Sequence, residues 1–202
     1  MQDIDGAVNF VKSLGYKHIY LIGSSTGANK IAIYNKYKPE NEVEKYILEC
    51  GGDDSGIYYS SVTKAKFEMV LKKCKQMIHK GRGRELVPKY IMNYAISYQS
   101  LFDQIDPEGD YNTFPFYWSL NNIKIMKKKA FGEVEQIDKP TLVIYGSEDE
   151  YCYGRVSDCM NLIRNTIKGK NNFEFEIIPG ADHGFTNHWQ ELADSVAKFL
   201  ET

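Results

Sequence analysis

The chain has 202 residues, of which 43% are hydrophobic, and its 25 basic and 27 acidic side chains give a formal net charge of −2. This length suits one domain with a sizeable core, and the near-neutral charge argues against nucleic acid or an anionic membrane as the principal partner. No apolar run approaches the length of a membrane span and the first residues do not resemble a secretory signal. The sequence therefore predicts a soluble, cytoplasmic protein.

The first elements alternate between helix and strand. Apolar spacing predicts a helix over residues 3–14, then a short strand over residues 19–22. A glycine- and serine-rich turn at residues 23–27 leads into a second helix that ends before Pro39, and residues 45–50 form a second strand. This alternation with short turns predicts an α/β fold whose mostly parallel sheet is flanked by helices.

The pattern changes after the second strand. A long helix is predicted over residues 61–80, and an interrupted segment rich in tyrosine and phenylalanine follows, with a short helix from Ser97. We interpret residues 57–130 as an insertion of helices and loops over the end of the sheet, within a single domain that spans residues 1–202.

Regular alternation resumes at Pro140. The sequence predicts an apolar strand over residues 141–145, a helix over 154–168, a strand nearer an edge over 173–178 and a closing amphipathic helix over 188–200.

A G-x-S-x-G pattern, Gly23-Ser24-Ser25-Thr26-Gly27, lies between the first strand and the second helix. A serine on so sharp a turn has a strained backbone, and we expect the two glycines to remove side-chain collisions there. The turn would lift Ser25 clear of the sheet and direct the N–H of Thr26 at the group that Ser25 attacks. Ser24 is a rival, and a plain turn with solvated serines is the alternative interpretation.

Two later turns at predicted strand ends carry an acid and a histidine. Because sites in parallel α/β sheets lie at the carboxyl ends of strands, we expect Ser25 to attack, His183 to accept and later return its proton, and Asp149 to orient the imidazole. A hydrogen bond to the backbone is the alternative role for His183. Three nearby acids compete with Asp149: Glu148, Glu150 and Asp182.

The remaining polar residues near strand ends have ordinary structural interpretations. Asp53 and Asp54 follow the second strand, where they could bind a ligand, and capping of the next helix is favoured. The four cysteines are scattered without metal-binding spacing, so buried free thiols are expected and no structural metal.

The three turns together resemble the nucleophile elbow, the acid turn and the histidine turn of α/β-hydrolases, in the same chain order. The resemblance covers nearly the whole chain, with residues 57–130 at the position of the family's cap. Residues 51–54, 80–88 and 97–102 are also similar to a branch that includes fungal siderophore-esterase-like proteins. The resemblance implies a serine hydrolase that cleaves a small ester or related acyl substrate through an acyl-enzyme, without a metal or organic cofactor.

The chain departs from the family in front of Ser25. Members usually have several strands there, including the loop that donates the second oxyanion N–H, whereas one helix and one strand precede Ser25 here. Loss of one such donor typically costs about 100- to 1000-fold in rate. We therefore expect an N-terminally truncated version of the fold, which a late start, a shortened chain or a homo-oligomer would explain. In the last case a partner covers the edge beside residues 19–22.

Two functional interpretations remain open from sequence. The first is the serine hydrolase, with an apolar or aromatic acyl or alcohol group facing the aromatic residues of the insertion, for which packing is the alternative role. The second is a non-catalytic binding or interaction module with an incomplete oxyanion hole. The aromatic candidates for substrate contact are Tyr98, Phe102, Phe116 and Trp118, together with Tyr94 and Phe114.

Overall fold

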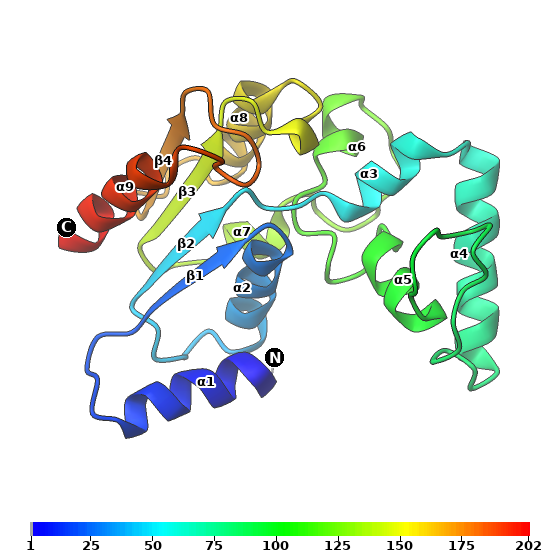
Figure 1. Ribbon diagram of the computed structural model, residues 1–202, viewed down its shortest axis with the longest axis horizontal. Helices are drawn as coiled ribbons and strands as arrows, with labels where there is room; N and C mark the ends of the chain where they lie inside the picture. Colours follow the sequence, from blue (N-terminus) through cyan, green and yellow to red (C-terminus); the bar gives the residue numbers. More distant parts are fainter. Residues whose placement is uncertain (1) are drawn as a thin grey trace.

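The computed structural model describes residues 2–202 and contains a parallel sheet whose strands follow the order β1-β2-β3-β4 (Figure 1). This confirms the predicted α/β class with a mostly parallel sheet. The central strand β3 is buried along its whole length, as expected for an apolar strand between two others. The strands are β1 Tyr20–Ser24, β2 Lys45–Glu49, β3 Thr141–Gly146 and β4 Phe173–Ile178.

Helices flank this sheet, close to the predicted positions. The helix α2 packs against β1 and β2, and α9 packs against β4. No helix within residues 2–202 combines the length and the low charge that crossing a bilayer requires. These flanking elements are α1 Gln2–Ser13, α2 Thr26–Tyr37, α7 Gly132–Glu135, the 3₁₀ turn η1 Glu150–Cys152, α8 Val156–Thr166 and α9 Trp189–Glu201.

The chain between β2 and β3 forms a helical lobe, which we define as residues 54–126 (Figure 1). Most of its buried apolar side chains, among them Phe67, Leu101 and Trp118, form a cluster separate from the one that surrounds the sheet, which Phe114 and Phe116 join. The interpretation of residues 57–130 as an insertion within one domain stays a prediction. The helices of the lobe are α3 Asp54–Ser61, α4 Lys64–His79, α5 Tyr98–Ile105 and α6 Phe116–Leu120.

The predicted helix over residues 61–80 begins too early. Asp53 starts the separate helix α3 by accepting a hydrogen bond from the Gly56 N–H, and Thr63 starts α4 by accepting one from the Lys66 N–H. Each side chain satisfies an N–H of a first helical turn that has no partner within the helix. The short helix α3 therefore ends at Ser61, and the long helix α4 begins only at Lys64.

Strand β1 forms one edge of the sheet. Within residues 2–202 it pairs only with β2, and its side chains Tyr20 and Ile22 are 36% and 51% exposed. An apolar edge of this kind is open to pairing with another chain. Its coverage in a homo-oligomer stays a prediction.

Candidate active site

Ser25 occupies the turn between the end of β1 and the start of α2. Its φ of 55° and ψ of −125° lie in a region that side-chain-bearing residues rarely adopt. Two hydrogen bonds fix the turn: the Ser25 N–H donates to the Glu49 carbonyl (2.8 Å) and the Ser25 carbonyl accepts from the Ala28 N–H (2.9 Å). Ser25 therefore has the strained strand-to-helix geometry that the motif predicts.

The two glycines of the motif do not play the same part. A Cβ on Gly23 would lie 2.4 Å from the carbonyl oxygen of Gly27, so only glycine lets β1 and α2 approach so closely. A Cβ on Gly27 would meet nothing within 4 Å outside its own helix. The prediction that both glycines remove collisions is therefore correct for Gly23 and wrong for Gly27.

Asp149 and His183 meet at the carboxyl end of β3. The Asp149 side chain is 2% exposed, and its Oδ2 lies 3.0 Å from Nδ1 of His183. Its other oxygen accepts a hydrogen bond from the Tyr151 N–H at 2.9 Å, which caps η1. Asp149 thus serves as helix cap and as partner of the imidazole at once. This partner assigns the proton to Nδ1 and leaves the Nε2 lone pair free.

The surroundings of His183 favour its charged form. Burial lowers the pKa of His183, but the hydrogen bond and the charge of Asp149, with the charges of Glu150 and Glu49, outweigh burial and raise the pKa above its ordinary value. The ring of Tyr151 contacts the imidazole edge to face, with 4.6 Å between ring centroids. Sequence reasoning missed both Glu49 and Tyr151 as neighbours of His183.

The competing acids have other partners. Glu150 accepts a hydrogen bond from the backbone N–H of His183 (3.1 Å), and Asp182 accepts from the N–H groups of Gly184 and Thr186. Both therefore shape the histidine turn, while Asp149 alone of these acids bonds to the ring.

The carboxyl end of β2 adds further titratable groups. Burial raises the pKa of Glu49, although the charge of His183 and a hydrogen bond from Ser24 lower it. The thiol of Cys50 has ligand atoms of Asp149 and His183 within 4.8 Å, so these three residues could together contact a metal ion. Burial and the Asp149 charge raise the pKa of Cys50, which keeps the thiol neutral and unsuited to act as a nucleophile. Their position at a strand end is the sequence signal that could have identified Glu49 and Cys50.

Thr26 is the first residue of α2, so its N–H lies in the turn that has no partner within the helix. This is the position expected of an oxyanion donor. Within residues 2–202 no hydrogen bond joins Ser25 to His183. Such serine–base contacts are often long before substrate binds.

Asp53 caps α3 as predicted, whereas Asp54 does not act as a cap. Asp53 also accepts hydrogen bonds from the Tyr117 N–H (2.7 Å) and the Tyr153 hydroxyl (3.0 Å). Asp54 is the first residue of α3, and its Oδ2 is buried without a hydrogen-bond partner among residues 2–202.

The aromatic candidates are mostly interior. Tyr98 and Trp118 are 5% and 2% exposed in the lobe core, and Phe116 is 1% exposed in the sheet core. The ring of half-buried Phe102 lies 5.4 Å from the Lys75 ammonium. Three of the four rings proposed for substrate contact are therefore packed against protein and present no free face.

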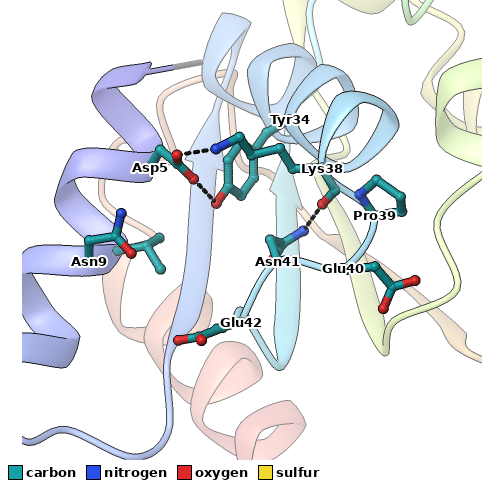
Figure 2. A pocket seen from close by; sticks show the side chains of 9 residues that line it. Asp5, Asn9, Tyr34, Lys38, Pro39, Glu40, Asn41 and Glu42 are labelled. Atoms are coloured by element: carbon teal, nitrogen blue, oxygen red, sulfur yellow. Dashed lines mark hydrogen bonds and ion pairs between the residues drawn. The ribbon is translucent and has the colours of Figure 1, made fainter.

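A pocket of about 420 Å³ lies at the opposite end of the sheet, between α1 and the loop after α2 (Figure 2). Asp5 accepts a hydrogen bond from the Tyr34 hydroxyl (3.1 Å) and pairs with Lys38. Burial and this hydrogen bond raise the pKa of Tyr34 to about 12. These polar groups satisfy one another, so the candidate site remains at the carboxyl ends of the strands.

Comparisons with known proteins agree with this geometry at the level of the fold. A family model described as "Protein of unknown function (DUF1749)" matches residues 1–201, and no curated protein matches the chain. A monoacylglycerol lipase from Paleococcus ferrophilus is similar in structure, with a TM-score of 0.58 at 16% identity, over 98% of this chain and 72% of that chain. An esterase from Exiguobacterium antarcticum gives a TM-score of 0.53 at 16% identity, over 99% of this chain and 72% of that chain. The fold is that of the α/β-hydrolases, which confirms the resemblance at this level, while the narrower siderophore-esterase-like branch stays a prediction.

Proposed function

Since the chain belongs to the DUF1749 family, whose function is unknown, we propose from its own residues that it is a serine hydrolase that cleaves an ester or related acyl bond. The observation that carries the proposal is the 3.0 Å contact between Nδ1 of His183 and Oδ2 of Asp149, at the same end of the sheet as the strained Ser25. The similar folds of an esterase and a monoacylglycerol lipase make esters the first substrates to test.

In the proposed reaction the Ser25 hydroxyl oxygen attacks the acyl carbon, and its proton passes to Nε2 of His183. Asp149 stabilises the imidazolium and holds its Nδ1–H. The Thr26 N–H donates a hydrogen bond to the oxyanion that forms on the former carbonyl oxygen. When the bond to the leaving group breaks, that group takes the proton from His183 and the acyl group remains on Ser25.

The second half of the proposed reaction uses the same groups. A water molecule gives a proton to Nε2 of His183 as its oxygen attacks the acyl carbon. The bond to the Ser25 oxygen then breaks, Ser25 regains a proton from His183 and the free acid leaves.

A fluorophosphonate probe tests the proposal because it reacts covalently with activated serines. We expect labelling of the native chain, its loss in Ser25→Ala and its retention in Ser24→Ala, since Ser24 is the last residue of β1 and lies one position from the elbow. Mass spectrometry of the labelled peptide identifies the serine. No labelling of the folded native chain would overturn the proposal and favour the non-catalytic binding module.

A further inference from the structure

A small cavity lies beside the N-terminus of α2, between that helix and the helical lobe. Its volume is about 180 Å³, below the range of about 300–1,000 Å³ that is usual for sites of drug-sized ligands. Thr26 forms part of its wall, so the cavity begins one residue after the candidate nucleophile. A cavity in this place has room for a small acyl or alcohol group.

Every side chain that lines this cavity carries a polar group. Each side chain around it carries a hydroxyl, amide, ammonium or carboxylate group: Thr26, Lys30, Asp54, Ser100, Asp103 and Gln104, with Tyr111 beside them. Three of the four aromatic rings proposed for substrate contact are packed in the two cores instead. A polar wall of this kind favours a ligand that forms hydrogen bonds and disfavours one that leaves the wall unpaired.

Asp54 is the most informative residue of the lining. Its Oδ2 is buried and accepts no hydrogen bond within residues 2–202, and an unpaired buried acceptor costs free energy until a donor arrives. Burial raises the pKa of Asp54, and the charge of His183 lowers it. Asp54 also lines the cavity, where its carboxylate is one of two acids that a bound group would meet.

The charges of the lining include both signs. Lys30 contributes a positive charge beside the carboxyl groups of Asp54 and Asp103, and Asp103 already accepts a hydrogen bond from Gln99 (2.8 Å). This mixture gives little overall preference for an anionic or a cationic ligand. It is compatible with an uncharged group that donates a hydrogen bond.

We propose that this cavity is the substrate pocket of the hydrolase and that it takes a small acyl or alcohol group bearing a hydroxyl, whose hydrogen bond Asp54 accepts. The inference rests on the proposed function. It replaces the apolar or aromatic group expected from the sequence with a hydroxylated one, and it makes Asp54 a specificity-determining residue.

Two pairs of esters test the inference, one for each side of the scissile bond. Glycerol monobutyrate is compared with propyl butyrate, and the para-nitrophenyl ester of beta-hydroxybutyrate with that of butyrate. We expect kcat/KM to be at least about tenfold higher for the hydroxylated member of one pair, because the apolar analogue cannot donate a hydrogen bond to the Asp54 carboxylate. Asp54→Leu, which replaces the two carboxylate oxygens with methyl groups on the same branched skeleton, is expected to abolish or reverse this preference.

Matched variants separate recognition from a general loss of folding. Asp106 lies at the end of α5, outside the cavity lining. Asp106→Asn is therefore expected to keep the native preference for hydroxylated esters. If Asp54→Leu does not fold, Asp54→Asn is measured instead, with a reduced preference expected because the charge of the acceptor is lost.

The outcomes distinguish the inference from the proposed function. Equal or better turnover of the apolar esters, or fluorophosphonate labelling of Ser25 without turnover of any of the four esters, would overturn the inference alone. A native chain that neither reacts with the probe nor cleaves an ester would overturn the proposed function as well.

Discussion

The sheet and the helical lobe hold their chemically important residues in different ways. Ser25, Asp149 and His183 each follow a strand closely, and hydrogen bonds of the turn backbone constrain the first and the last of them. The lobe has no strand of the sheet and is organised around its own cluster of aromatic and aliphatic side chains. Under the proposed function, the sheet part supplies the reacting groups and the lobe supplies the wall that selects the substrate.

Charge divides the two regions as well. Residues 64–89 of the lobe contain nine lysines and arginines and two glutamates, whereas the other residues of the chain have sixteen basic and twenty-five acidic side chains. The net charge of −2 is therefore the sum of +7 on this basic segment and −9 on the acidic remainder. Arguments from net charge apply to each region separately.

The first test of this division of roles removes the negative charge of Asp149, the acid on the sheet side. Asp149→Asn keeps the size of the buried side chain but places an amide opposite Nδ1 of His183, which favours the wrong tautomer. We expect kcat/KM for an ester to fall by about 10⁴-fold with little change in the lobe. Steady-state kinetics measure the effect. Asp158→Asn, which removes an exposed partner of Arg155, is the control and should retain native activity.

The next test disrupts the lobe and leaves the candidate triad in place. Trp118 is buried and contacts Tyr59 and Phe67 edge to face, so Trp118→Ala leaves a large cavity. We expect a loss of about 3–5 kcal/mol in stability, against less than about 0.5 kcal/mol for the exposed Tyr94→Ala. Hydrogen exchange should show lost protection in α4 and α5 with β3 still protected. Equal loss in β3 would show that the two clusters unfold as one unit.

The part of this organisation that was predicted from sequence depends on local patterns. The strands, the serine turn and the positions of Asp149 and His183 follow from apolar runs and from residues that directly succeed them. The choice between Asp149 and Glu150 depends on which carboxylate points at the ring, and spacing along the chain does not determine this. In the structure, Asp149 bonds to the ring of His183, and its neighbour Glu150 bonds to the backbone N–H of His183.

The burial of individual aromatic rings and the approach of Glu49 and Asp54 to the site could not be predicted from sequence, because they depend on packing between distant segments. Phe116 and Tyr94 both belong to the aromatic-rich part of the insertion, yet one is buried in the sheet core and the other is 52% exposed. The approach of Glu49 to the site depends on strand register, which pairs it with Ser24. The unpaired oxygen of Asp54 depends on how the lobe lies against α2.

A third test concerns the junction between the regions. Asp53 joins α3, α6 and Tyr153, and burial raises its pKa to about 6, against the opposing effect of its three donors. Since this pKa lies above the ordinary value of 3.8, the folded chain binds the proton more tightly than the unfolded chain between these values. The contribution of Asp53 to stability therefore falls as pH rises from about 4 to 6, by up to about 3 kcal/mol, and is constant above that range.

Asp53→Asn isolates this contribution because the amide resembles the protonated acid. We expect the native chain to lose stability relative to the variant as pH rises from about 4 to about 6, with no further change above that range, as measured by urea unfolding. Asp138→Asn, whose side chain is almost fully exposed, should show no such trend. A difference between the native chain and Asp53→Asn that does not change with pH would contradict the assignment.

A last, smaller effect concerns which region of the molecule raises the pKa of the candidate base His183. His183 must be neutral to accept a proton, so kcat/KM should fall as pH drops through its raised pKa. Glu150→Gln retains an acceptor for the His183 N–H but removes a negative charge, which lowers that pKa and moves the acid limb of the profile to lower pH. Glu135→Gln, which breaks a pair with Lys129 away from the site, is the control. The negative charge of Asp54, which belongs to the lobe, also favours the protonated form of His183. An acid limb that moves with Asp54→Asn and not with Glu150→Gln would show that the lobe shifts the pKa of His183 as well as selecting the substrate.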